Sequence, residues 1–221
     1  MTDPDYTHLA LIVDRSGSMQ RIVTDMNGAI EHLVKDQESV PGRISIDVTT
    51  FDDTVEFVGR DLTPQGVLEL APLVVPRGMT ALYDAIGKTV VALGEHLAKM
   101  DDVTRPGKVL VAIVTDGLEN SSKDWALPAL NELITQQREQ YGWEFTFLGA
   151  NMDAIAVAGD MGIPRGSSMT YNTTAAGVAG GTTSLTAGIR RYRSAGPGGQ
   201  SILYTDAERD AALGEEPDDQ F

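Results

Sequence analysis

The chain has 221 residues, of which 42% are hydrophobic and 22% charged, and it contains no cysteine. This composition is that of an ordinary globular protein and excludes a bilayer-spanning or wholly disordered chain, while the lack of cysteine excludes disulfides and thiol chemistry. The 17 basic and 32 acidic residues give a net charge of −15, which disfavours nucleic acid and anionic membrane surfaces as partners.

The length suits one domain followed by a short tail. We expect an α/β domain over residues 1–195 and an acidic, flexible tail over residues 196–221, because residues 206–221 hold seven acids and one base after a glycine-rich stretch. The start of the chain shows no basic secretory leader, which together with the absence of cysteine favours a cytoplasmic location.

Short apolar runs alternate along the chain with longer amphipathic stretches, which indicates strands buried between two helical layers. We predict strands over residues 8–13, 44–51, 55–60, 109–115, 145–148 and 168–171. We predict helices over residues 21–36, 65–70, 81–100, 125–141, 154–161 and 183–193. The second and third strands are joined by too few residues for a parallel crossover, so they should form a hairpin. The predicted fold is a doubly wound, mostly parallel six-stranded sheet with one antiparallel edge strand and helices on both faces.

Residues 175–188 contain four glycines among small residues. Each glycine inside a helix costs roughly 1 kcal/mol relative to alanine, so a helix here should be marginal. Two interpretations stay open, a loosely ordered return helix and a mobile switch element.

The first predicted strand ends on a carboxylate that is followed by two hydroxyls at alternating positions, Asp14, Ser16 and Ser18. Gly17 permits a tight turn between them, so the three side chains can converge on one point. Their oxygens are the hard ligands that Mg²⁺ prefers. The same residues would also suit an Asx turn in which Ser18 caps the next helix, without any metal.

The strand predicted over residues 109–115 runs directly into Asp116 and Gly117. In an open doubly wound sheet, the loops at the carboxyl ends of the strands form the site, above all where the strand order reverses. If the two strands flank that point, Asp14 and Asp116 face one crevice.

Three short motifs carry a resemblance to a known family: Asp14-x-Ser16-x-Ser18, Gly78-Met79-Thr80 at a helix start, and Thr115-Asp116-Gly117. Their order and context resemble the von Willebrand factor A (VWA) family, and by topology the resemblance covers roughly residues 6–193. It implies a Rossmann-like VWA fold with a metal-ion-dependent adhesion site whose ligands are Asp14, Ser16, Ser18, Thr80 and Asp116.

The resemblance also implies what the site binds. Ser16, Ser18 and Thr80 would supply hydroxyl ligands, and Asp14 and Asp116 would act directly or through water. The implied ion is Mg²⁺, with Mn²⁺ or Ca²⁺ as alternatives, and in the family a partner protein's Asp or Glu carboxylate fills its open position. A binding module without catalytic residues is therefore expected.

Seven residues on the surrounding loops are candidates for contacting the partner: Arg15, Met19, Gln20, Met79, Leu118, Glu119 and Asn120. Asp84, one turn into the helix after Thr80, should favour the helix dipole rather than touch the metal. Intracellular members of the family often serve multiprotein assemblies, including those driven by AAA+ ATPases, and we expect this type. Residues 147–154 resemble stand-alone bacterial and phage members.

Two other function classes remain as alternatives. An aspartate after the first strand is also where aspartate-nucleophile phosphatases place theirs, but those families repeat the acid two positions on, where this chain has Ser16. The other alternative is a structural or assembly protein, such as a virion component, in which the metal serves stability alone.

Overall fold

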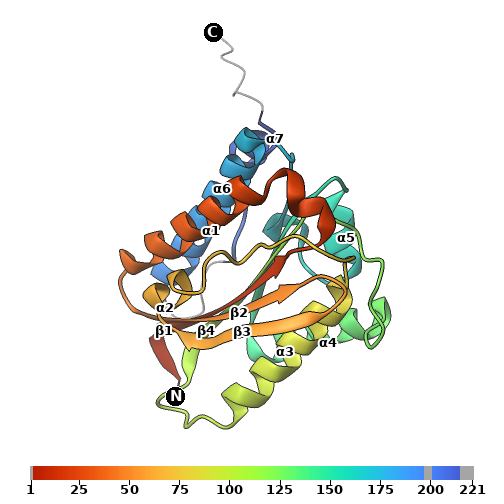
Figure 1. Ribbon diagram of the computed structural model, residues 1–221. Helices are drawn as coiled ribbons and strands as arrows, with labels where there is room; N and C mark the ends of the chain where they lie inside the picture. Colours follow the sequence, from red (N-terminus) through yellow and green to blue (C-terminus); the bar gives the residue numbers. More distant parts are fainter. Residues whose placement is uncertain (1, 197–200, 215–221) are drawn as a thin grey trace.

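The computed structural model describes residues 2–196 and 201–214 and contains one six-stranded sheet in the order β3-β2-β1-β4-β5-β6 (Figure 1). The strands are β1 (Asp3–Asp14), β2 (Arg43–Phe51), β3 (Val55–Leu62), β4 (Pro106–Thr115), β5 (Glu144–Ala150) and β6 (Ser168–Tyr171). All neighbours pair in parallel except β2 and β3, which form the antiparallel hairpin at the edge. The predicted fold class is therefore confirmed, although β1 begins five residues earlier than the pattern indicated.

Helices cover both faces of the sheet. They are α1 (Val23–Glu38), α2 (Pro64–Leu68), α3 (Leu82–Ala98), α4 (Leu127–Tyr141), α5 (Ala154–Asp160), α6 (Ala175–Ser194) and α7 (Asp206–Leu213). In Figure 1, α1 and α6 lie side by side over one face, and α3 and α4 lie over the other. Within the described residues, no helix has the length and apolar character that crossing a bilayer requires.

The centre of the sheet is β1, whose side chains alternate between two apolar cores. Leu9, Leu11 and Val13 pack into the core under α1 and α6. Ala10 and Ile12 pack into the core under α3 and α4. Burial on both faces explains why the sequence of β1 is a continuous apolar run. The strand ends at Asp14, whose side chain is therefore buried in the protein.

The glycine-rich segment is a regular part of α6, which starts at Ala175 and not at residue 183 as predicted. Thr174 caps its first turn by accepting a hydrogen bond from the backbone N–H of Gly177 (3.0 Å). The glycines also let α7 approach, since a Cβ at Gly177 would lie 3.0 Å from the carbonyl oxygen of Ala212 and one at Gly180 would overlap the Ala211 backbone. Close packing against α7 thus offsets the low helix propensity that favoured a loose helix.

The predicted boundary at residue 195 is wrong for the segment that follows, because residues 201–214 pack onto the domain. Ile202 and Tyr204 are buried, and α7 lies against α6. Thr205 and Glu208 form a reciprocal capping box that starts α7, and Glu208 also pairs with Arg191 at 2.8 Å. The acidic residues of α7 therefore belong to a docked helix, while the predicted tail residues 197–200 and 215–221 lie outside the described part of the chain.

Candidate metal centre

Two neighbouring strands bring carboxylates to the same edge of the sheet. Asp14 ends β1 and Asp116 directly follows β4, and the register pairs Val13 with Val114. After β1 the chain passes to α1 on one face, and after β4 it passes to α4 on the other. The two aspartates therefore lie at the topological switch point, where open α/β sheets bind their ligands.

A chain of hydroxyl contacts joins these carboxylates. The backbone N–H of Ser16 donates to Asp14 Oδ1 (2.6 Å), and Ser16 Oγ lies 3.0 Å from Ser18 Oγ. Ser18 Oγ in turn donates to Asp116 Oδ1 (2.5 Å). The alternating spacing read from the sequence thus places the first motif and Asp116 around one point.

Thr80 reaches the same point from the turn before α3. The hydroxyls of Thr80 and Ser18 both lie close to Gly117. A Cβ atom added at Gly117 would be 3.0 Å from Thr80 Oγ1 and 3.6 Å from Ser18 Oγ. The backbone also ties the two loops together, because the N–H of Gly17 donates to the carbonyl of Gly78 (3.2 Å). The structure therefore brings all five predicted site residues into one cluster.

Neither carboxylate of this cluster forms an ion pair within the described residues. Asp14 is fully buried and Asp116 is 3% exposed, and within residues 2–196 and 201–214 neither lies within ion-pair distance of a lysine, arginine or histidine. Burial raises the pKa of Asp14 to about 6, against hydrogen bonds from Thr115 and Ser16 that lower it. Burial likewise raises the pKa of Asp116, which the hydrogen bond from Ser18 and the charge of Arg21 oppose. Buried carboxylates without a cation are costly, so a bound divalent ion fits this donor set.

Three residues that were not predicted as ligands support the cluster and the loop that follows it. Thr115 Oγ1 donates to Asp14 Oδ2 (2.5 Å). Asn151 Nδ2 donates to the carbonyl of Asp116 (3.2 Å) from the end of β5, and Asp84 accepts from the backbone N–H groups of residues 123–125. Thr115 was recognisable as the residue before Asp116, and Asn151 lies within the stretch 147–154 that carried part of the resemblance, although no role was predicted for it.

Asp84 lies in the first turn of α3, where a carboxylate favours the helix dipole as predicted, and it also holds a loop. Its carboxylate binds the loop that leads from Asp116 towards α4, with the N–H of Trp125 at 2.9 Å. Glu119 acts similarly, accepting from the N–H groups of Ser121 and Ser122. The surrounding loops are thus built on buried acceptors for backbone N–H groups.

Four of the seven residues expected to contact a partner are occupied within the fold. Met19 is fully buried in the core, and Arg15 is buried in ion pairs. Glu119 holds its loop, and Asn120 accepts from the N–H of Thr80 (2.9 Å) through Oδ1. These four side chains serve structural roles.

The remaining three candidates are exposed beside the cluster. Met79 is 55% and Leu118 is 53% exposed, and Gln20 is also exposed. Of the three, Gln20 borders a depression of about 490 Å³, whose lining residues are Gly17, Ser18, Gln20, Arg21, Asp116, Asn151 and Thr173. The metal-ligand candidates Ser18 and Asp116 therefore border a solvent-accessible hollow.

A second buried aspartate lies next to the cluster but is fully paired. Asp52 follows β2, and its Oδ2 accepts from Arg15 Nε (3.0 Å) and Arg77 Nε (2.6 Å). Burial alone would raise the pKa of Asp52, but hydrogen bonds from Arg77 and Thr54 and the charge of Arg15 hold it well below its usual range. The carbonyl of Asp52 also accepts from the N–H of Ala81 (2.7 Å), which fixes the turn that carries Thr80.

Solved structures with similar folds share this architecture. The chain superposes on proximal thread matrix protein 1 from the mussel byssus with a zinc-occupied MIDAS motif, at a TM-score of 0.62 and 15% identity, over 84% of this chain and 46% of that chain. A von Willebrand factor type A protein from Catenulispora acidiphila matches with a TM-score of 0.59 and 14% identity, over 84% of this chain and 43% of that chain.

A third structure is matched over nearly its whole length. The vWF domain of the type V pili tip protein Mfa5 from Porphyromonas gingivalis has a TM-score of 0.61 and 10% identity, over 89% of this chain and 98% of that chain. No protein-family model matches the sequence, and no curated protein matches it. The chain spans under half the length of the mussel and Catenulispora proteins, and the three likenesses establish a von Willebrand factor A fold.

Proposed function

We propose that this chain, whose fold is that of a von Willebrand factor A domain, is a Mg²⁺-dependent protein-binding module and not an enzyme. The observation that carries the proposal is the pair of buried carboxylates, Asp14 and Asp116, that share hydroxyl contacts but form no ion pair with a cationic side chain in the described residues. Mn²⁺ or Ca²⁺ are alternative ions for the same oxygen ligands.

In this proposal, Ser16, Ser18 and Thr80 offer hydroxyl ligands and the two aspartates offer charge, directly or through water. Mg²⁺ keeps near-octahedral geometry and retains several waters, so a site of this kind keeps a position open to an incoming oxygen. An Asp or Glu carboxylate of a partner protein suits that position. The bound ion would reverse the local sign of charge, which explains how a chain of net charge −15 can attract an acidic group.

The surface beside the ion suits a protein partner. Met79 and Leu118 are more than half exposed on the two loops that flank Thr80 and Asp116. A flexible methionine and a leucine provide adaptable apolar contact, and interfaces combine such a centre with a polar rim. We propose that these two side chains contact the partner around the carboxylate.

We further propose that the module acts in the cytoplasm within a multiprotein assembly, with an AAA+ ATPase as one class of partner, and that it is of the stand-alone bacterial or phage type. The sequence resemblance supports this setting, together with the absence of cysteine. Neither nucleic acid nor a membrane surface is expected as a partner, because the net charge is strongly negative.

Two measurements test the proposal. Calorimetric titration of the chelator-treated protein with Mg²⁺ should show binding that is lost in Ser16→Ala and Asp14→Ala. Affinity capture from lysate should retain a partner with wild type in Mg²⁺, but not in EDTA and not with Asp14→Ala.

Asp25→Ala is the matched control, since Asp25 is an exposed acid on α1 outside the cluster. It should behave as wild type in both measurements. A partner retained equally by wild type, Asp14→Ala and EDTA-treated protein would instead support a metal used for stability alone, and phosphoester hydrolysis abolished by Asp14→Asn would support the phosphohydrolase alternative.

A further inference from the structure

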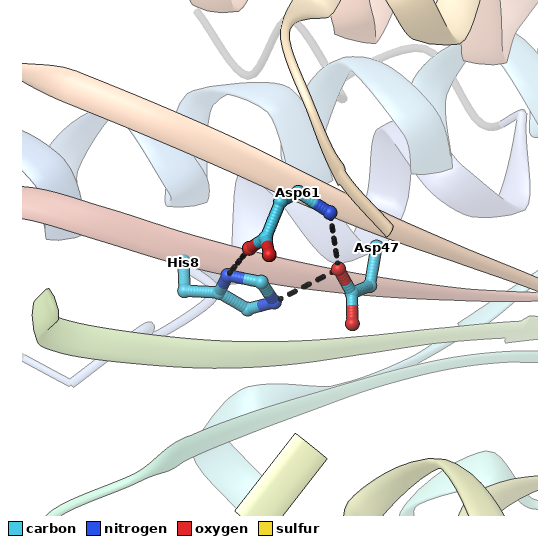
Figure 2. Close-up of side chains that lie close together, drawn as sticks. All are labelled: His8, Asp47 and Asp61. Atoms are coloured by element: carbon cyan, nitrogen blue, oxygen red, sulfur yellow. Dashed lines mark hydrogen bonds and ion pairs between the residues drawn. The ribbon is translucent and has the colours of Figure 1, made fainter. Parts of the chain in front are cut away.

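A second group of ligating side chains lies on the same central strand but away from Asp14. It contains His8 of β1, Asp47 of β2 and Asp61 of β3, and one ligand atom from each lies within 4.8 Å of the others (Figure 2). His8 and Asp14 are six positions apart along β1, which at about 3.3 Å per position is roughly 20 Å. The two clusters are therefore distinct sites.

A β-bulge brings Asp61 to this place. The register pairs Ile46 with Leu62 and Val48 with Gly59, so two residues of β3, Arg60 and Asp61, oppose the single residue Asp47. Asp61 takes a positive φ of 51°, and its N–H donates to Asp47 Oδ1 (2.8 Å). Bulges re-aim side chains, and a non-glycine residue at positive φ is often kept for function.

The two ring nitrogens of His8 face different carboxylates of the cluster, Nε2 towards Asp47 and Nδ1 towards Asp61, whose Oδ1 lies 3.7 Å away (Figure 2). Its Nδ1 also lies 2.8 Å from Ser45 Oγ, which contacts the hydroxyl of Tyr6 at 2.7 Å. Its Nε2 lies 3.4 Å from Asp47 Oδ1, yet this fully buried atom has no hydrogen-bond partner among the described residues. A hydroxyl that holds Nδ1–H leaves the Nε2 lone pair for a ligand, which is how metal-binding histidines are oriented.

His96 of α3 lies outside this group of three and contacts only the second carboxylate oxygen of Asp61, Oδ2. Its Nε2 lies 2.8 Å from Asp61 Oδ2, but the two atoms are out of line for a hydrogen bond and this Nε2 is also unpartnered. With metal–ligand bonds of about 2.0–2.1 Å, two ligands of one tetrahedral ion lie roughly 3.4 Å apart and off each other's lone-pair axis. The 3.4 Å between His8 Nε2 and Asp47 Oδ1 matches this spacing. The 2.8 Å between His96 Nε2 and Asp61 Oδ2 is shorter, so these two atoms would move apart on binding a common ion.

We propose that His8, Asp47, Asp61 and His96 form a binding site for a divalent transition-metal ion, with Zn²⁺ as the best match. Two imidazole nitrogens and two carboxylates suit Zn²⁺, whereas Mg²⁺ and Ca²⁺ take oxygen ligands. The ion would join β1, the β2–β3 hairpin and α3, so its role is to fix the edge of the sheet. This inference does not rest on the Mg²⁺ proposal.

Direct ion pairing is the competing explanation for the cluster. Protonated histidines would neutralise Asp47 and Asp61 without a metal, and Arg60 Nε already lies 3.6 Å from Asp47 Oδ2. If the residues bind a metal, removing one ligand should lower the affinity for Zn²⁺. If they only form ion pairs, the same change should leave Zn²⁺ affinity unchanged. The two explanations also differ in the ligands that a bound ion would show.

The test uses the full chain carrying Asp14→Ala, so that the cluster at Asp14 and Asp116 does not contribute. After treatment with chelator, the protein is titrated with Zn²⁺ by calorimetry and with Co²⁺ by visible absorption. We expect one Zn²⁺ per chain and the intense absorption of tetrahedral Co²⁺. Adding His96→Gln or Asp61→Asn should lower Zn²⁺ affinity at least about 10-fold, since even indirect ligand supports are worth that much.

His32→Gln is the matched control, because His32 is an exposed histidine on α1, and it should leave both signals unchanged. Equal Zn²⁺ affinity in His96→Gln, Asp61→Asn and this control would overturn the proposal. So would the absence of Zn²⁺ binding by the parent, which is the Asp14→Ala chain without a further substitution. X-ray absorption of Zn²⁺ in the parent is independent of whether the ligand variants fold. It should show imidazole nitrogens, and a shell of oxygens alone would also overturn the proposal.

Discussion

Asp14 and Asp52 occupy equivalent places at the ends of the neighbouring strands β1 and β2, and both are fully buried. Their surroundings are nevertheless opposite. Asp52 is paired with two arginines, Arg15 and Arg77, whereas Asp14 has only hydroxyl and backbone N–H donors, from Thr115 and Ser16. The pKa of Asp52 is accordingly lowered and that of Asp14 is raised to about 6.

This difference separates a structural carboxylate from a binding one. The fold supplies its own cations to Asp52, which then holds Arg15 and the turn before Thr80 in place. It supplies none to Asp14, so the energetic cost of burying that charge can be recovered by an ion from solution. Changing each aspartate should therefore have opposite consequences for stability.

The largest effect is expected from Asp52→Asn. Arg15 is 8% exposed and would lose a buried partner, and breaking a buried ion pair typically costs about 3 kcal/mol or more. The free energy of unfolding should fall by this order in urea titrations, with or without Mg²⁺. Glu56→Gln removes the solvent-exposed partner of the same arginine and should cost below about 1 kcal/mol; similar losses in the two variants would mean that burial does not set the difference.

Asp14→Asn should have the opposite sign in metal-free protein at neutral pH. It removes an unpaired buried charge, and a pKa raised to about 6 from 3.8 corresponds to about 3 kcal/mol as an upper estimate. We expect the melting temperature to rise in EDTA and its response to Mg²⁺ to disappear. Asp101→Asn, at an exposed position, controls for net charge, and a destabilised Asp14→Asn that still responds to Mg²⁺ would contradict the comparison.

A smaller effect follows from the titration of Asp14 itself. Because its pKa is raised to about 6 in the folded chain, the folded state binds the proton more tightly than the unfolded state does. This contribution is complete below the unfolded pKa and is lost as the pH rises through about 6, so metal-free stability should fall by about 1 kcal/mol between pH 5 and pH 7. Urea titrations at both pH values should show a smaller fall in Asp14→Asn, where only Asp116 still contributes, and an equal fall would assign the effect elsewhere.

The sequence was sufficient for the sheet and for the cluster around Asp14 because both are encoded locally. An apolar run that ends on Asp14, Ser16 and Ser18 shows the strand, its carboxyl end and the converging oxygens within a few residues. The short link between residues 51 and 55 likewise specified the antiparallel hairpin. Asp116 and Thr80 lie far along the chain, and they were predicted through the expected strand order and the family resemblance.

The features that the sequence did not predict depend on tertiary packing. His8, Asp47, Asp61 and His96 come from four elements, and the bulge in β3 is what brings Asp61 to His8 and Asp47. The length of α6 depends on α7 packing against its glycines. The start of α7 was readable from Thr205 and Glu208 as a capping box, but the acidic composition of the segment suggested a free tail instead.

The bulge in β3 has a consequence for how copies of this chain behave at high concentration. β3 forms one margin of the sheet, where an unpaired strand is a template for edge-to-edge aggregation. The irregular register opposite Asp47 interrupts that template, and the exposed charges of Glu56 and Arg60 flank the exposed ring of Phe57. The bulge that positions Asp61 therefore also disfavours pairing of the edge strand β3 with a second copy of the chain.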